Sequence, residues 1–167
     1  ELLQPQQPLV LLADQRGVLL RRDLRPPDLV RLEHGLSAAV AGELLLALSQ
    51  GMAIAKGMAA AGATIVFNDI KQELVDKGLA AYEEAGIKAH GYVCDVTNED
   101  AVNELVAKIE AEVGVIDILV NNAGIIKRIP MCEMTAAQFR QVIDVDLNAP
   151  FIVAKAVIPS MIKKGHG

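Results

Sequence analysis

The sequence has 167 residues (17.8 kDa), enough for one domain with a hydrophobic core. Its net charge of -5 argues against a nucleic-acid partner, because binding to phosphate backbones depends on clustered Lys and Arg. A membrane span needs roughly 18 uncharged apolar residues, and the longest candidate, residues 35–48, is interrupted by Glu43. We therefore predict a protein with neither a nucleic-acid nor a membrane partner.

The cysteines and histidines are too scattered to suggest a metal site. Cys94 and Cys132 lie far apart, and neither has a Cys or His neighbour at ligand spacing. The three histidines, His34, His90 and His166, are equally isolated. No secretory pattern opens the chain, and a sequence without a disulfide framework is typical of a reducing compartment. We predict no metal and a cytoplasmic location.

Composition divides the chain near residue 50. Residues 1–50 contain fifteen Leu and five Arg but no Ile or Lys, whereas residues 51–167 contain fourteen Ile, nine Lys and only two Arg. This contrast predicts that residues 1–50 are an unrelated Leu/Arg-rich segment that arose from a fusion, a misassigned start or an out-of-frame reading. A natural helical extension is the alternative. Residues 51–167 are then predicted to be a domain of their own.

Within the first segment, prolines prevent one long helix, and residues 1 to about 34 are expected to be poorly ordered. Residues 35–50 fit a helix, because Leu36, Val40, Leu44 and Leu48 recur on one face. Residues 8–13 are the one stretch here that fits a substitute first strand.

Regular alternation of helices and strands begins at Gly51. Helices are predicted over residues 52–61 and 71–85, each ended by a glycine, and over 101–113, after a capping sequence that starts at Thr97. Short apolar strands are predicted over residues 63–67, 90–94 and 116–120. Thr135 is expected to cap a last helix over residues 136–161, bent near Pro150 and Pro159.

This alternation predicts an α/β fold of the Rossmann type, a doubly wound parallel sheet. Residues 51–167 are therefore predicted to be a partial dinucleotide-binding domain, with the first and last strands of the sheet missing or replaced. Ligands of such sheets bind outside the carboxyl ends of the strands, where Asp69, Asp95 and Asn122 are predicted to converge.

Two aspartates end predicted strands. Asp69 is placed to accept hydrogen bonds from both hydroxyls of an adenosine ribose, which favours NAD, although NADP stays open. An ordinary turn role is the alternative. Asp95, with the amide of Val96, suits the edge of an adenine, and helix capping is its alternative.

The run Asn121-Asn122-Ala123-Gly124 follows an apolar strand. Small residues let backbone approach a ribose closely, while amide side chains connect neighbouring strands. Together with Asp95-Val96 and the strand that ends in Asp69, this run resembles the short-chain dehydrogenases over residues 51–167. Residues 62–70 and 146–151 are most similar to gluconate 5-dehydrogenases. The resemblance implies hydride transfer between NAD(P) and a hydroxyl of a small sugar acid, and a homo-oligomer when intact.

Two parts of the family's site are incomplete in this sequence. The resemblance places a glycine-rich phosphate turn before the first helix, and only its last glycine remains, as Gly51. The catalytic Ser and the Tyr-x-x-x-Lys pattern are absent, since Tyr82 and Tyr92 are followed four positions later by Gly86 and Val96. Asp146 stands where the family has an asparagine that assists proton relay.

Three hypotheses follow. The first is an NAD(P)-dependent dehydrogenase of which this sequence is a piece, inactive by itself. The second is a non-catalytic nucleotide-binding or interaction module, and the third is a gene-prediction artefact. The residues predicted to bind cofactor are Gly51, Asp69, Asp95, Val96, Asn122, Ala123 and Gly124.

Overall fold

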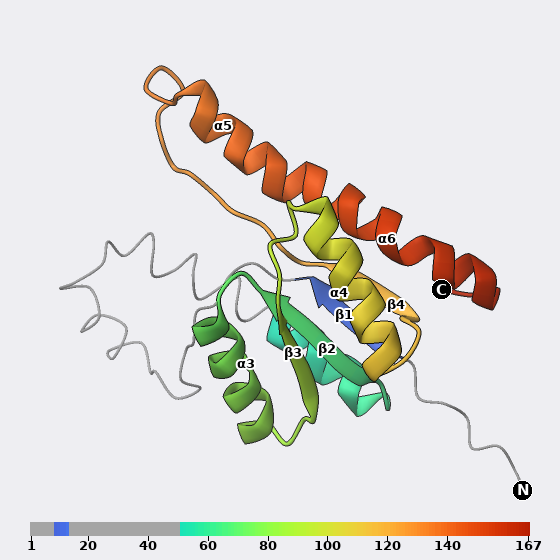
Figure 1. The fold of residues 1–167 in the computed structure, drawn as a ribbon. Helices are drawn as coiled ribbons and strands as arrows, with labels where there is room; N and C mark the ends of the chain where they lie inside the picture. The colour runs from blue at the N-terminus through green and yellow to red at the C-terminus, as the bar shows by residue number, and fades with distance from the viewer. Residues whose placement is uncertain (1–8, 14–50) are drawn as a thin grey trace, which may run out of the picture.

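The computed structural model describes residues 9–13 and 51–167, which form a four-stranded parallel sheet with helices on both faces (Figure 1). The strands are ordered β3-β2-β1-β4. The two inner strands are β1 (Leu9–Ala13) and β2 (Thr64–Asp69), and the outer ones are β3 (Ala89–Val93) and β4 (Ile118–Asn121). This order confirms the predicted Rossmann-type fold.

Strand β1 replaces the first strand of the fold. Leu9 pairs with Thr64 of β2, and Val10 pairs with Ile118 of β4. Residues 9–11 are at most 4% exposed, as expected of a central parallel strand that is apolar on both faces. The prediction of poor order over residues 1–34 is therefore wrong for residues 9–13. The other predictions for residues 1–50, including the helix over 35–50, lie outside the described residues.

Each face of the sheet has its own hydrophobic cluster. The helix of residues 51–60 and α3 (Gln72–Glu84) cover one face, and α4 (Glu99–Glu112) and α6 (Ala149–Lys164) cover the other (Figure 1). The buried residues of the first cluster are Val10, Ala55, Ile65, Phe67, Val75 and Tyr82. The second includes Leu9, Leu11, Val66, Val96, Ile109, Ile116, Val153 and Val157. Two covered faces are what a doubly wound sheet requires.

The glycines predicted to end two helices are confirmed, whereas the predicted start of α4 is corrected to Glu99. Gly62 and Gly86 follow their helices with φ of 94° and 72°, a conformation that glycine adopts without steric cost. The cap of α4 is Asn98 rather than Thr97, since the Asn98 side chain accepts a hydrogen bond from the Ala101 amide at 3.1 Å. The Thr97 hydroxyl instead donates to Asp95.

The last predicted helix is divided in the structure. Thr135 caps α5 (Ala136–Ile143) as predicted, and a π-helical turn, η1 (Asp144–Asn148), connects α5 to α6. Pro150 has no amide to donate, so the α-helical ladder is interrupted just before it, and a wider turn takes its place. The expected end at residue 161 is wrong by three residues, because α6 continues to Lys164.

Residues 136–164 form a helical stretch of 29 residues, which is long and apolar enough by composition to cross a membrane. Val153 and Val157 of this stretch are buried against the sheet and α4. Core helices of globular domains pass the same test of length and hydropathy, so a membrane partner does not follow from it. The predicted absence of a membrane partner stays a prediction.

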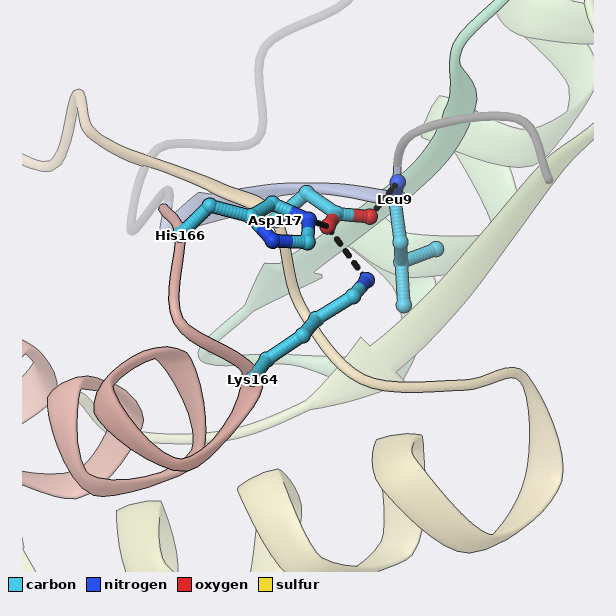
Figure 2. Close-up of polar contacts among 4 residues, drawn as sticks. All are labelled: Leu9, Asp117, Lys164 and His166. Carbon is cyan, nitrogen blue, oxygen red and sulfur yellow. Dashed lines mark hydrogen bonds and ion pairs between the residues drawn. The ribbon is translucent and has the colours of Figure 1, made fainter. Parts of the chain in front are cut away.

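Asp117 connects three parts of the chain at the amino edge of the sheet (Figure 2). Its Oδ2 accepts a hydrogen bond from the Leu9 amide at 2.9 Å. Its Oδ1 lies 2.5 Å from Lys164 Nζ and 3.3 Å from His166 Nε2. Burial raises the pKa of the carboxyl, but hydrogen bonds from Lys164 and Leu9 and the nearby positive charges outweigh this effect and lower the pKa below its ordinary value.

This lowered pKa predicts an acid-dependent loss of stability. A carboxyl with a lowered folded-state pKa stabilises the fold above the unfolded value, near pH 4, and loses that contribution as the pH falls through the folded value. We expect Asp117→Asn to be less stable than wild type by about 1 kcal/mol at pH 6. The difference should shrink as the pH falls below about 4. Urea unfolding of both proteins from about pH 6 down to about pH 2.5 measures this difference, and parallel pH profiles would refute the assignment.

Candidate functional site at the carboxyl edge of the sheet

The carboxyl ends of the strands bring the predicted site segments together. Ala13, at the end of β1, is in register with Asn68 of β2 on one side and with Asn121 of β4 on the other. Asp69 is in register with Val93 at the end of β3. Neighbouring strands lie about 4.8 Å apart, so segments distant in sequence meet along one edge, as predicted.

Asp69 is held in a fixed position at this edge. It is only 4% exposed, and its Oδ1 accepts a hydrogen bond from the Ile70 amide at 2.6 Å. The strand extends through Asp69 rather than ending at residue 67, because the carbonyl of Asp69 accepts a hydrogen bond from the Cys94 amide. The structure thus holds the Asp69 carboxylate at the carboxyl edge of the sheet, where the sequence predicts a contact with ribose hydroxyls.

Asn68 supports this arrangement and was not predicted as a site residue. Its side chain is 1% exposed and donates to the carbonyl of Cys94 at 3.3 Å, which connects the ends of β2 and β3. The signal in the sequence was a polar residue directly after the apolar run 65–67, one position before Asp69.

The residues after β3 form a tight polar turn. Asp95 Oδ1 accepts hydrogen bonds from the amide of Thr97 at 2.9 Å and from its hydroxyl at 2.7 Å. Asp95 is therefore not the cap of α4, a role that Asn98 fills. Val96 is 1% exposed and anchors the turn in the core, which fixes the path of the backbone at the edge.

The run after β4 lies at the same edge. Asn121 is the last residue of β4, and Asn122, Ala123 and Gly124 are half-buried. Gly124 does not have a positive φ, and a Cβ added there would come no closer than 3.5 Å to its nearest neighbour, Asp146 Oδ1. Neither backbone conformation nor packing within the described residues therefore requires glycine at this position.

Asp146 connects the π-helical turn to this run. Its Oδ1 accepts a hydrogen bond from the Ile125 amide at 2.7 Å, and the side chain is exposed. An ionised carboxylate only accepts hydrogen bonds, whereas an asparagine also donates them. The geometry accordingly gives Asp146 a positioning contact with the backbone that follows Gly124. The sequence indicated a bend near Pro150, but not the π-helical turn that presents Asp146.

Two further titratable groups near the strands, Cys94 and Tyr92, are poorly suited to proton transfer or nucleophilic attack. Burial and then the charge of Asp95 raise the pKa of the Cys94 thiol to about 11. Burial, followed by the hydrogen bond to Glu112 and the charge of that residue, raises the pKa of Tyr92 to about 12. Both groups stay protonated near neutral pH. Among the described residues, this edge can offer hydrogen bonds to hydroxyls and amides, and close backbone approach.

Gly51 is buried and begins the helix of residues 51–60. Crossover helices of a doubly wound sheet start at its carboxyl edge, which is the position where such folds bind pyrophosphate. Residues 14–50, which connect β1 to this helix, lie outside the described part. The predicted loss of the phosphate turn is therefore untested by the geometry.

Comparison with known proteins identifies the family. A sequence profile of the short chain dehydrogenases matches residues 48–167. The chain belongs to the short-chain dehydrogenase family. The matched region begins just before Gly51, close to the change in composition, and contains every predicted cofactor residue. Membership confirms the resemblance drawn from Asp69, Asp95-Val96 and the run that ends in Gly124.

Several similar proteins in the family are named as enzymes that act on sugar acids. The chain is 55% identical over 118 residues to a 2-dehydro-3-deoxy-D-gluconate 5-dehydrogenase of Formosa agariphila, and the match covers 70% of this chain and 45% of that protein. A solved 2-keto-3-deoxy-D-gluconate dehydrogenase from Streptococcus agalactiae is 76% identical, with a TM-score of 0.64, over 70% of this chain and 44% of that one. The chain thus spans about half the length of the relatives it matches.

A third relative was solved with cofactor. The gluconate 5-dehydrogenase of Burkholderia cenocepacia J2315, in complex with NADP and tartrate, is 30% identical with a TM-score of 0.69. That likeness covers 97% of this chain and 52% of that one. The short-chain dehydrogenases are NAD(P)-dependent oxidoreductases, so the edge described above is the place to look for cofactor binding.

Proposed function

We propose that this chain is part of an NAD(P)-dependent dehydrogenase that oxidises a hydroxyl of a sugar acid such as gluconate to a ketone, or catalyses the reverse reaction. Three observations support the proposal: family membership, the names of the relatives, and the set of polar groups at the carboxyl edge. The cofactor would supply hydride transfer. The residues of this chain would bind and orient it.

The observation that carries the proposal is Gly124. Glycine is unnecessary there for the described fold, because an added Cβ would make only an ordinary contact with Asp146. We attribute the glycine to a ribose that would approach the backbone closely at this position. Asp69 would accept hydrogen bonds from the hydroxyls of the adenosine ribose, which favours NAD over NADP. Asp95 and the amide of Val96 would hold the adenine, and Asn122 with Ala123 would border the second ribose.

The 167-residue chain is predicted to lack turnover, because the sequence has no Tyr-x-x-x-Lys pattern to exchange a proton with substrate. We expect no NADH formation from gluconate and NAD above the rate without protein, although NADH should bind. A matched positive control is the same chain extended to the length of its relatives. Turnover by the 167-residue chain would contradict the prediction.

The same experiment distinguishes the dehydrogenase from the second candidate function, a non-catalytic nucleotide-binding module. Both candidates allow NADH to bind, but only the dehydrogenase predicts that the extended chain turns over gluconate.

The two cysteines are free, which supports a cytoplasmic setting, and the net charge of -5 supports small-molecule substrates over nucleic acid.

We further propose a homo-oligomer for the intact protein, in which α5 and α6 contact a second copy. Large apolar side chains on these helices and η1 are exposed, with Leu147 at 63%, Phe151 at 67% and Ile162 at 75%, and such patches are typical of interfaces. Phe151→Glu should shift the extended protein toward monomer in sedimentation velocity, and Lys163→Glu, on the same helix, should not. An unchanged oligomer with Phe151→Glu would contradict this interface.

A further inference from the structure

The apolar pattern of β1 does not by itself determine how the strand aligns with its neighbours. The strand reads Leu-Val-Leu-Leu-Ala, and it contributes buried side chains to both faces, Leu9 and Leu11 to one cluster and Val10 to the other. A slip of one residue exchanges the faces of all side chains, but here it exchanges one aliphatic side chain for another. Hydrophobic burial alone therefore discriminates weakly between registers.

Hydrogen bonds with Asp117 favour the observed register of β1 over a shifted one. The carboxylate accepts a hydrogen bond from the Leu9 amide at 2.9 Å, and the Asp117 amide donates to the Leu9 carbonyl at 2.9 Å. Both polar groups of Leu9 are thus bonded to one residue. A slip of one residue moves the Leu9 amide by about 3.3 Å, which breaks both bonds.

The carboxylate is itself fixed by the end of α6. Lys164 and His166 both approach Oδ1, while Oδ2 faces β1 (Figure 2). Asp117 is 13% exposed and Lys164 is 30% exposed. Less water surrounds this pair than the other ion pair of α6, Lys155 with Glu99, whose side chains are 60% and 51% exposed. The Lys155 pair joins α6 to α4 and does not touch β1.

We propose that Asp117 fixes the register of β1, a role that we call the register lock. Lys164, at the end of α6, and His166, just after it, hold the Asp117 carboxylate in position. The lock lies at the amino edge, but its effect extends along the strand. The register that begins with Leu9 opposite Thr64 places Ala13 between Asn68 and Asn121 at the carboxyl edge. The end of α6 thereby acts on the alignment of the strand ends that form the candidate site.

The lock is tested by NMR on the full 167-residue chain, with two readouts. Interstrand NOEs between Leu11 and Leu119 report the register, and amide exchange of β1 reports how often it opens. We expect Asp117→Leu to weaken the native NOEs and to speed exchange of the β1 amides by about tenfold or more. Lys164→Met should speed that exchange severalfold. Lys155→Met, the matched control on the same helix, should leave it unchanged.

Asp117→Asn keeps an oxygen for the Leu9 amide but loses the charge that Lys164 contacts, and it serves as the variant that retains the fold. For Asp117→Asn, native NOEs with exchange close to that of Lys164→Met support the lock. Equal exchange rates in Lys164→Met, Lys155→Met and wild type would overturn the coupling to α6. Native NOEs and unchanged exchange in Asp117→Leu would overturn the lock altogether.

Discussion

Replacing Leu11 by alanine should lower the free energy of unfolding of the chain by about 2–5 kcal/mol. Leu11 is 1% exposed and belongs to the cluster between the sheet and helices α4 and α6. Replacing its isobutyl group with a methyl group leaves a cavity that surrounding side chains cannot readily fill, since β1 is paired on both sides. Urea or thermal unfolding followed by circular dichroism measures the loss.

The matched control is Ile126→Ala, because Ile126 is 54% exposed. Its effect should stay within about 0.5 kcal/mol of wild type. The pair tests whether residues 9–13 belong to the fold, despite a composition unlike that of residues 51–167. If Leu11→Ala were as harmless as Ile126→Ala, β1 would not be the central strand.

The second large effect is expected at Asp69. Asp69→Asn should weaken NADH binding about tenfold, because hydrogen bonds from ribose hydroxyls to a charged carboxylate are stronger than those to an amide oxygen. The same change should reduce the preference for NADH over NADPH, because it removes a negative charge that repels a 2'-phosphate. Titration of nucleotide fluorescence with each protein gives both dissociation constants.

Asp76→Asn is the control for this variant. Asp76 lies on α3, where it is exposed and bonded to Gln72, so its loss changes net charge equally without touching the edge. Its NADH affinity should remain close to that of wild type. If Asp69→Asn and Asp76→Asn bind both nucleotides alike, Asp69 does not contact the adenosine ribose.

Much of the fold from residue 51 onward was predictable, because apolar runs, glycines and capping residues act locally. The strands that end near Asp69 and Asp95 and the helix ends at Gly62 and Gly86 follow from such signals. The parallel arrangement of the strands then places their polar ends at one edge without further information. The candidate site residues were assigned from these signals together with the family resemblance, and their contact with a cofactor stays a prediction.

What could not be predicted depends on tertiary contacts. Residues 8–13 fitted a substitute first strand, but only the pairing with β2 and β4 shows that β1 lies between them. The π-turn before Pro150 and the contact of Asp146 with the Ile125 amide arise where α5 and α6 join. Choosing Asn98 over Thr97 as the cap depends on the turn that Asp95 makes.

The central claim is that the carboxyl edge of this sheet binds a dinucleotide, and amide chemical shifts measured during titration with NAD test it most directly. We predict the largest shift changes at Asp69-Ile70, at Asp95 to Thr97 and at Asn122 to Ile125. Amides at the amino edge, around Thr64 and Asp117, should change little. Changes centred on the amino edge, or no changes at millimolar NAD, would contradict the claim.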